Sequence, residues 1–284
     1  MPRVTVIMAT YNWSTVLPFS IGSALAQTFT DFELLVVGDG CTDDSARVVA
    51  AIEDPRVRWI DLQPATGHQS GPNNEGLRQA RGELIAYLGH DDLWLPHHLA
   101  SAVAAIDAGA DLAHSILAMV LPEGRPQPIT PVPSGWMPPS CVVHRRRMTE
   151  DIGVWRDYRE TPVNPEHELW LRAAAAGYTF AFVPRMTGVK IPASMRRDVY
   201  RDRPCHEQAA WLARIRSEPD LEVVELSKMV VALNGRFLTR FSARVSRLLS
   251  QPSQWLAFVW RRKGRRIRAV QRFKGADRSR IPSE

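Results

Sequence analysis

Short apolar runs recur along the first part of the chain, and the stretches between them carry apolar residues at helical spacing. The runs cover residues 4–8, 32–37, 57–62, 84–88 and 112–120. Each is too short for three helical turns, so we expect strands. Helices are expected over 14–27, with Ser14 as N-cap, and over 44–52, 74–80 and 95–108. Strands that alternate with helices predict an α/β fold, with a mostly parallel sheet and helices on both of its faces.

The regular alternation ends at residues 121–139. Seven prolines and two glycines fall among these nineteen residues, a composition that predicts a loop without regular structure. Regular secondary structure is expected again at 140–144. A helix over 166–176, a strand over 179–183 and mostly helical sequence after Pro204 should follow.

The composition narrows the setting in which the chain works. Its three cysteines are widely spaced, which excludes a CxxC metal knuckle or a disulfide framework and indicates a reducing, cytoplasmic setting. No apolar stretch reaches the roughly 18 residues of a membrane-spanning helix, and the first residues lack the pattern of a signal peptide. We therefore expect a cytoplasmic protein that is not integral to a membrane.

The net charge of +6 is distributed unevenly. Residues 228–284 hold 15 Lys or Arg and two acids, a local charge of +13, which leaves −7 for residues 1–227. We therefore expect no nucleic acid partner for the main domain. Residues 236–249 have an apolar face and an arginine face, and an apolar patch at 255–260 precedes a basic run at 261–266. These features predict a helix on an anionic membrane surface, and a helix packed on the main domain is the alternative.

The apolar run 84–88 stops at Gly89 and is followed closely by two adjacent acids, Asp91 and Asp92. Ligands of open α/β sheets bind at the carboxyl ends of strands. Adjacent carboxylates repel one another, and a divalent cation with oxygen ligands relieves that repulsion. The pair is therefore a candidate metal site. A cap for the helix expected over 95–108 is the alternative.

Two other expected strands also end in polar residues. The first is followed by Ala9, Thr10, Tyr11 and Asn12, a loop suited to hold a base or a ribose. It lacks the glycines of a phosphate-binding loop, and a plain turn is the alternative. The second ends at Asp39 between two glycines, where a carboxylate can accept from a base or a ribose hydroxyl or belong to an ordinary turn.

Taken together, these segments resemble the family 2 glycosyltransferases, whose fold is the GT-A nucleotide-sugar fold. The resemblance covers residues 3–120 and rests on several motifs in the family order. They are VTVIMATYN at 4–12, SALAQTF at 23–29, FELLVVGDG at 32–40, NEGL at 74–77, ARGE at 80–83 and the acid pair.

The resemblance implies roles for individual residues. Those matching donor-binding positions are Ala9, Thr10, Tyr11, Asn12, Asp39, Asn74 and Asp91. Asp91 and Asp92 match the DXD region, in which carboxylates bind Mg²⁺ or Mn²⁺ and the diphosphate of the sugar nucleotide. Because Gly89 stands where many relatives carry an aspartate, Asp92 is expected to carry most of the metal binding. Such an ion would neutralise the charge that develops on the diphosphate as it leaves the anomeric carbon.

The resemblance also implies a catalytic base. The family carries acids at the start of a helix, and the matching stretch here is PEHELWLR at 165–172. Glu166 matches the base that deprotonates the acceptor hydroxyl, and Glu168 a neighbouring acid. Attack in one step implies inversion at the anomeric carbon. From the residues alone, the alternative is that these acids have no catalytic role and simply lie at a helix N-terminus, where the helix dipole favours negative charge. Trp136 lies where the family shapes the acceptor side.

Three differences from the family pattern stand out. Gly89 and Gly38 replace acidic or polar residues, Asn73 replaces a frequent arginine, and the base is Glu rather than Asp. They leave open an altered nucleotide preference, a weaker catalyst or a non-catalytic nucleotide-sugar-binding or scaffold protein. A sugar nucleotidyltransferase is a further alternative, but it requires a glycine-rich, arginine-bearing N-terminal loop that residues 9–12 do not provide.

We expect a metal-dependent, inverting glycosyltransferase of cell-envelope or exopolysaccharide synthesis. Its partners would be a nucleotide diphosphate sugar and a glycan or lipid-linked acceptor. Residues 1–220 would form the catalytic domain, with the nucleotide-sugar half at 1–120 and the acceptor half at 121–220. Residues 221–284 would form a helical, basic tail that places the protein at the inner face of a membrane.

Overall fold

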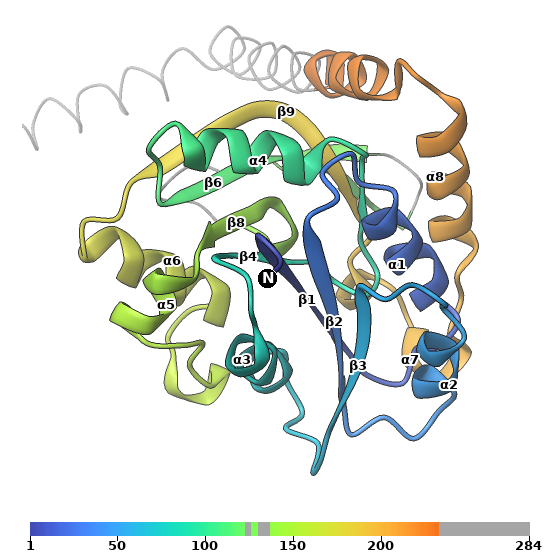
Figure 1. Ribbon diagram of the computed structural model, residues 1–284. Helices are drawn as coiled ribbons and strands as arrows, with labels where there is room; N and C mark the ends of the chain where they lie inside the picture. The colour runs from blue at the N-terminus through green and yellow to red at the C-terminus, as the bar shows by residue number, and fades with distance from the viewer. Residues whose placement is uncertain (123–125, 130–136, 233–284) are drawn as a thin grey trace, which may run out of the picture. The chain divides into compact units, whose positions relative to one another are not determined.

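The computed structural model describes residues 1–122, 126–129 and 137–232. Residues 1–229 form one compact unit, and a second unit begins at Val230. Figure 1 shows the first unit as a twisted sheet with helices packed around it. The expected α/β class with helices on both faces of the sheet is confirmed.

The first half of the sheet is parallel. Its strands lie in the order β3 (Val57–Leu62), β2 (Phe32–Asp39), β1 (Val4–Thr10) and β4 (Leu84–Tyr87). The crossover helices are α1 (Leu17–Leu25), α2 (Ser45–Ala50) and α3 (Ser70–Gln79). β1 lies in the middle, with Val4 paired to Phe32 on one side and to Leu84 on the other. The carboxyl ends of these strands therefore meet at one edge of the sheet.

The second half of the sheet is mixed. Beyond β4, the described residues add β8 (Val142–Arg145), β6 (Leu112–Val120), β9 (Phe180–Lys190) and β5 (Leu93–Trp94), in that order. β8 is antiparallel to β4 and β6, whereas β6 and β9 run parallel. β9 is longer than the strand expected over 179–183, and it ends at Lys190.

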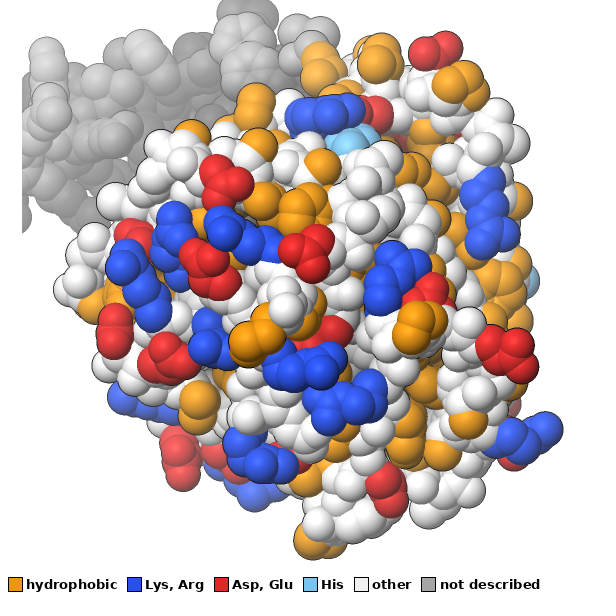
Figure 2. All heavy atoms as spheres, in the orientation of Figure 1, with side chains coloured by type: hydrophobic (Ala, Val, Ile, Leu, Met, Phe, Trp, Pro, Cys, Tyr) orange, Lys and Arg blue, Asp and Glu red, His pale blue; other side chains and the backbone are white. Residues whose placement is uncertain are grey.

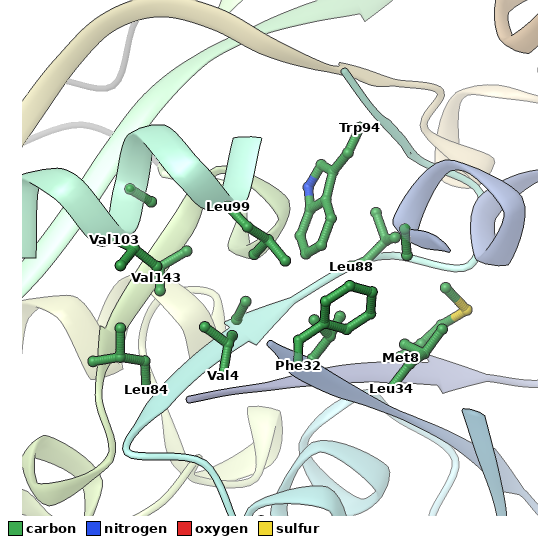
Figure 3. Packing of buried hydrophobic residues seen from close by; sticks show 14 of the residues in the cluster. Val4, Met8, Phe32, Leu34, Leu84, Leu88, Trp94, Leu99, Val103 and Val143 are labelled. Carbon is green, nitrogen blue, oxygen red and sulfur yellow. The ribbon is translucent and has the colours of Figure 1, made fainter. Parts of the chain in front are cut away.

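Apolar side chains fill both faces of the sheet. On one face, Val4, Val6 and Met8 of β1 pack in a core with α1 and α4 (His98–Asp107). Figure 3 shows Val4, Met8 and Leu34 from the strands lying near Leu99 and Trp94. On the other face, Ile7 and Tyr87 pack with α3 and two further helices, α5 (Arg146–Ile152) and α6 (Pro165–Ala175). Strands buried on both faces explain why the sequence shows continuous apolar runs.

Two helix starts differ from expectation. Ser14 does not cap α1, which begins at Leu17 with Val16 as its N-cap. The Ser14 amide instead donates to Asp43 Oδ2 at 2.9 Å. The acids Asp91 and Asp92 do not cap α4 either, since its N-cap is His97. The capping alternative for the acid pair is therefore wrong.

The expectation that residues 121–139 exclude regular structure is also wrong. The strand β7 (Pro126–Ile129) pairs antiparallel with β6, and Pro128 lies opposite Ala118. β7 is not on the main path of the sheet and pairs with β6 only. Proline has no N–H to donate, so it is tolerated where a strand pairs on a single side.

The C-terminal part of the first unit is helical, as expected after Pro204. It comprises α8 (His206–Ser217) and residues 221–229 of a helix that the structure describes over 221–232. Leu221, Glu225 and Met229 are buried, so the first turns of the expected tail pack within the first unit. No helix in the described ranges is both long and apolar enough to cross a membrane. The amphipathic and basic segments expected over 236–249 and 255–266 lie outside the described residues.

Surface charges on the first unit are mixed in sign. On the face drawn in Figure 2, basic side chains lie among acidic ones. Ion pairs on the surface of the first unit include Arg3 with Glu83 at 2.9 Å and Arg147 with Asp111 at 2.7 Å.

Candidate active site

The carboxyl ends of β1, β2 and β4 open onto a cavity of ≈ 820 Å³. The start of α6 and the residues after β9 close its other sides. The cavity gathers most of the residues predicted from the sequence. Its lining includes Ala9, Thr10, Tyr11, Asp39, Asp91, Asp92 and Glu166.

Three predicted residues lie outside this lining, and one is not described. Asn12 has a left-handed φ of 44°, and its Oδ1 accepts from the Thr42 amide at 2.8 Å, so it ties two loops together. Asn74 exchanges two hydrogen bonds with the backbone of Trp155, at 2.8 and 3.0 Å. Trp136 lies outside the described residues.

Glu168 is the third of these predicted residues, and it is held in ion pairs. Its carboxylate lies 2.8 Å from Arg172 Nε and 3.0 Å from Arg156 Nη1. The Arg172 guanidinium also donates to the backbone carbonyl of Val154 at 2.7 Å. Glu168 therefore fixes the loop that precedes α6.

Asp39 is buried and holds the loop after β3. Its Oδ1 accepts from the Thr66 amide at 2.7 Å, and its Oδ2 accepts from the Gly67 amide at 2.9 Å. The same loop supplies His68 and Gln69 to the cavity wall. Asp39 thus shapes the cavity through the loop as well as lining it directly.

Asp92 accepts hydrogen bonds through both of its carboxylate oxygens. Its Oδ2 accepts from Ser140 Oγ at 2.5 Å and from Lys190 Nζ at 3.1 Å, while its Oδ1 accepts from the Ile191 amide at 3.0 Å. Its relative exposure is 1%. Three donors therefore already occupy the carboxylate that was expected to carry most of the metal binding.

Asp91 is less fully bonded. Its Oδ2 accepts from the Ala193 amide at 3.0 Å, and its Oδ1 finds no hydrogen-bond donor among the described residues. A Cβ on Gly89 would lie 3.0 Å from this Oδ1 and 2.9 Å from Asp92 Oδ2. The carboxylates of the acid pair therefore lie close to the backbone of Gly89, in space that the side chain of the aspartate common at this position would need.

Lys190 places a buried cation among these acids. Burial lowers the pKa of its ammonium, but the carboxylates of Asp92 and Asp91 outweigh that effect and raise the pKa to about 12. Burial also raises the pKa of Asp92, and the Lys190 charge opposes this rise. The ammonium therefore stays charged at neutral pH.

An imidazole and two phenol rings surround the Thr10 side of the cavity. His90 Nδ1 lies 2.9 Å from Thr10 Oγ1, and burial lowers the pKa of this imidazole, which keeps it neutral. Tyr11 is 46% exposed, and its ring centroid lies 6.2 Å from that of Tyr200. Tyr200 belongs to the short helix α7 (Val199–Asp202) and lines the same cavity.

Glu166 lies in the first turn of α6. Pro165 begins the helix, where its missing N–H costs nothing, and Glu166 follows with 5% exposure. Its Oε2 accepts a hydrogen bond from Gln69 Nε2 at 2.9 Å. Glu166 is therefore a buried carboxylate on the cavity wall, and Gln69 holds one of its oxygens.

Sequence analysis missed four residues that the site uses, namely Lys190, Gln69, Tyr200 and His90. Lys190 carries a signal that could have been found, since it interrupts the otherwise uncharged stretch 186–195 at the end of a strand. Strand ends are where such folds bind their ligands.

The acids present fit a divalent ion that arrives with a diphosphate. No group of three or more His, Cys, Asp or Glu side chains suited to a metal occurs within the described ranges. However, Mg²⁺ typically takes only one or two carboxylates and completes its shell with phosphate oxygens and water. Asp91 is placed for such a contact. The geometry favours it over Asp92, the reverse of the order expected from the sequence.

Comparisons with known proteins identify the family of this chain. The model of Glycosyl transferase family 2 matches residues 5–150. The succinoglycan biosynthesis protein ExoO of Rhizobium meliloti (strain 1021) is 40% identical over 126 residues, 44% of this chain and 36% of its own length. The UDP-Glc:alpha-D-GlcNAc-diphosphoundecaprenol beta-1,3-glucosyltransferase WfgD of Escherichia coli is 35% identical over 96 residues, 34% of this chain and 38% of its own. The chain thus matches about a third of the length of these relatives.

Solved structures share the fold. S. aureus TarS 1-349 in complex with UDP-GlcNAc superposes with a TM-score of 0.57 at 19% identity, covering 84% of this chain and 73% of the other. The mannosyltransferase PcManGT from Pyrobaculum calidifontis, in complex with GDP-Man and Mn²⁺, gives a TM-score of 0.55 at 18% identity, covering 88% and 81%. The family model spans just over half of the sequence and includes the acid pair, so the chain belongs to glycosyl transferase family 2.

Proposed function

We propose that this protein transfers a sugar from a nucleotide diphosphate sugar to an acceptor hydroxyl, with inversion at the anomeric carbon, in the synthesis of a cell-envelope or secreted glycan. The observation that carries the proposal is that Glu166 and Asp91 line one cavity, together with the strand-end residues Thr10 and Tyr11. A base and a diphosphate site in one cavity are what a single displacement requires.

The nucleotide would bind at the Thr10 side of the cavity. Tyr11 offers an exposed ring on which a base can stack, with the Tyr200 ring beside it. Thr10 Oγ1 and the neutral His90 provide hydrogen-bonding groups at the same wall. Asp39 holds the loop below them. TarS, which shares the fold, has been solved with UDP-GlcNAc.

The diphosphate would lie beside the acid pair, where Asp91 would hold Mg²⁺ or Mn²⁺. When bound, such an ion neutralises negative charge on the departing nucleoside diphosphate. PcManGT, another protein of this fold, contains Mn²⁺ together with GDP-Man.

Glu166 would accept the proton of the acceptor hydroxyl. As that proton moves to the carboxylate, the acceptor oxygen forms a bond to the anomeric carbon. The bond from that carbon to the phosphate oxygen breaks, and its electron pair leaves with the diphosphate. Gln69 holds the carboxylate through Oε2. Attack from the face opposite the leaving group inverts the configuration.

We propose a lipid-linked or polysaccharide acceptor at the cytoplasmic face of a membrane. WfgD is by name a transferase to a diphosphoundecaprenol-linked sugar, and ExoO by name serves succinoglycan biosynthesis. The local charge of +13 over 228–284 is suited to an anionic lipid surface. Flotation with phosphatidylglycerol vesicles tests this, with a full-length variant carrying Arg261→Glu, Arg262→Glu and Arg265→Glu as comparison. Equal flotation of both proteins would contradict the membrane role.

The transfer itself is tested with a panel of UDP-, GDP- and dTDP-sugars in the presence of Mg²⁺ or Mn²⁺. A donor should raise the melting temperature, because a ligand that binds only the folded protein stabilises it. That donor should then release nucleoside diphosphate when a polyprenyl-diphosphate-linked sugar is added. Binding without release for every acceptor would instead support a nucleotide-sugar-binding protein, and no binding at all would contradict both functions.

A further inference from the structure

Lys190 places a strongly basic side chain in the cavity wall. Among the described residues that line it, Lys190 is the only Lys or Arg. Lys190 is the last residue of β9, and its side chain is 15% exposed and lies beside the acid pair. An anionic group that enters the cavity therefore meets the Lys190 ammonium.

The Lys190 ammonium keeps hydrogen-bonding capacity for a ligand. An ammonium carries three N–H donors. In the described structure one of them is used, toward Asp92 Oδ2 at 3.1 Å. The remaining donors have no acceptor among the described residues, although the group is nearly buried.

Asp92 does not depend on Lys190 alone. Ser140 Oγ and the Ile191 amide also donate to its carboxylate, at 2.5 and 3.0 Å. These two uncharged donors hold Asp92 in place if the ammonium turns toward an incoming anion. The ion pair can therefore be shared with a ligand without leaving a buried carboxylate unbonded.

We propose that Lys190 is a diphosphate-binding residue of the donor site, and that it binds the diphosphate without a divalent cation. This deepens the proposed function and rests on it, because it assigns the diphosphate to the same cavity. Asp91 and a divalent ion would then form a second, separable contact to the same group. The basis is charge complementarity between the Lys190 ammonium and an anion carried by every sugar nucleotide.

Inorganic pyrophosphate is a suitable probe, because it carries the recognised group without a base or a sugar. Calorimetric titration of the full-length protein in EDTA should show binding, and Lys190→Met should weaken it at least tenfold. Lys228→Met is the matched control, since Lys228 lies outside the cavity and its side chain is 57% exposed. With Mn²⁺ present, Lys190→Met should recover part of the affinity through Asp91.

Folding is tested separately, because Lys190→Met leaves Asp92 without its cationic partner. The double variant Lys190→Met with Asp92→Asn removes both charges and should melt close to the wild type, yet still bind pyrophosphate at least tenfold more weakly in EDTA. The proposal is overturned if wild-type protein binds no pyrophosphate in EDTA, or if either variant binds it as tightly as the wild type. Neither pyrophosphate binding nor melting requires sugar transfer. A failure of this proposal can therefore be told apart from a failure of the proposed function.

Discussion

The side-chain amide of Gln69 donates a hydrogen bond to Oε2 of Glu166 at 2.9 Å, joining residues 97 positions apart. Gln69 stands in the loop after β3, and Asp39 holds that loop through the Thr66 and Gly67 amides. A residue at the predicted nucleotide side of the cavity is therefore connected to the predicted base through one short loop. The donor and acceptor halves of the site share this support.

Replacing Gln69 with Leu should reduce the turnover number about tenfold and leave donor affinity nearly unchanged. The reason is that a hydrogen bond to a charged group contributes about 1.5–3 kcal/mol, and its loss here releases the carboxylate rather than the nucleotide. Steady-state kinetics together with donor titration separate the two effects. Gln79→Leu is the control, because Gln79 makes the same type of bond to Glu75, at 2.6 Å, outside the cavity. A loss of donor affinity without a fall in turnover would contradict the positioning role.

Replacing Asp91 with Asn should weaken the effect of Mn²⁺ on nucleoside diphosphate binding. Asparagine keeps an oxygen for the Ala193 amide, so the local fold is retained while the charge is lost. We expect the Mn²⁺-dependent gain in UDP or GDP affinity to fall at least tenfold, about 1.4 kcal/mol. Titrations with Mn²⁺ and with EDTA measure it, and Asp107→Asn on the surface is the control. An unchanged Mn²⁺ effect would exclude Asp91 as the ligand.

The Trp59 ring leaves no room for a side chain at Gly38. A Cβ at residue 38 would lie 2.3 Å from Cη2 of Trp59, so the ring occupies the space that the expected larger side chain would take. Gly38→Ala should cost about 1–3 kcal/mol of unfolding free energy through overpacking. The same change in a Trp59→Ala background should cost clearly less. Urea denaturation of the four proteins tests the coupling, and equal costs in both backgrounds would contradict it.

Two buried histidines should make stability fall at mildly acidic pH. Burial lowers the pKa of His98 to about 3 and that of His144 to about 4. Below pH 6.5 the unfolded chain binds protons that the folded protein cannot, so stability is present above that pH and is lost as the pH falls. Each histidine should lower the free energy of unfolding by about 1.4 kcal/mol for each pH unit below 6.5. The His144 contribution should level off near pH 4.

Denaturation at several pH values between 6.5 and 5 measures this slope. His98→Asn should reduce it by about one residue's contribution, while His206→Asn at an exposed position is the control. A slope that His98→Asn leaves unchanged would show that this imidazole does not remain neutral in the folded protein.

Local patterns were sufficient for the parallel half of the fold and for the strand-end residues of the site. Tyr11, Asp39 and Asp91 each follow closely on an apolar run, and such positions share one edge of a parallel sheet. Family resemblance was needed to choose between a turn and a binding role for these residues. It was also needed to select Glu166, because acids at a helix start are common.

Long-range contacts were not predictable in the same way. Lys190 meets Asp92 across 98 positions, and no local pattern specifies that meeting. The length of β9 was missed because Pro184 resembles a strand end. In the structure the register shifts between the pair His114–Phe182 and the pair Ile116–Met186, so an irregularity in the ladder accommodates the proline.

The most direct test of the account is sugar transfer by Glu166→Gln compared with the wild type, at a saturating concentration of the donor found in the panel. Glutamine preserves the size of the side chain but cannot accept the acceptor proton. We expect transfer to fall by about 10²–10⁴-fold with donor affinity nearly unchanged, and Glu150→Gln at an exposed position to behave as the wild type. Transfer by Glu166→Gln at the wild-type rate would contradict the assignment of Glu166 as the base.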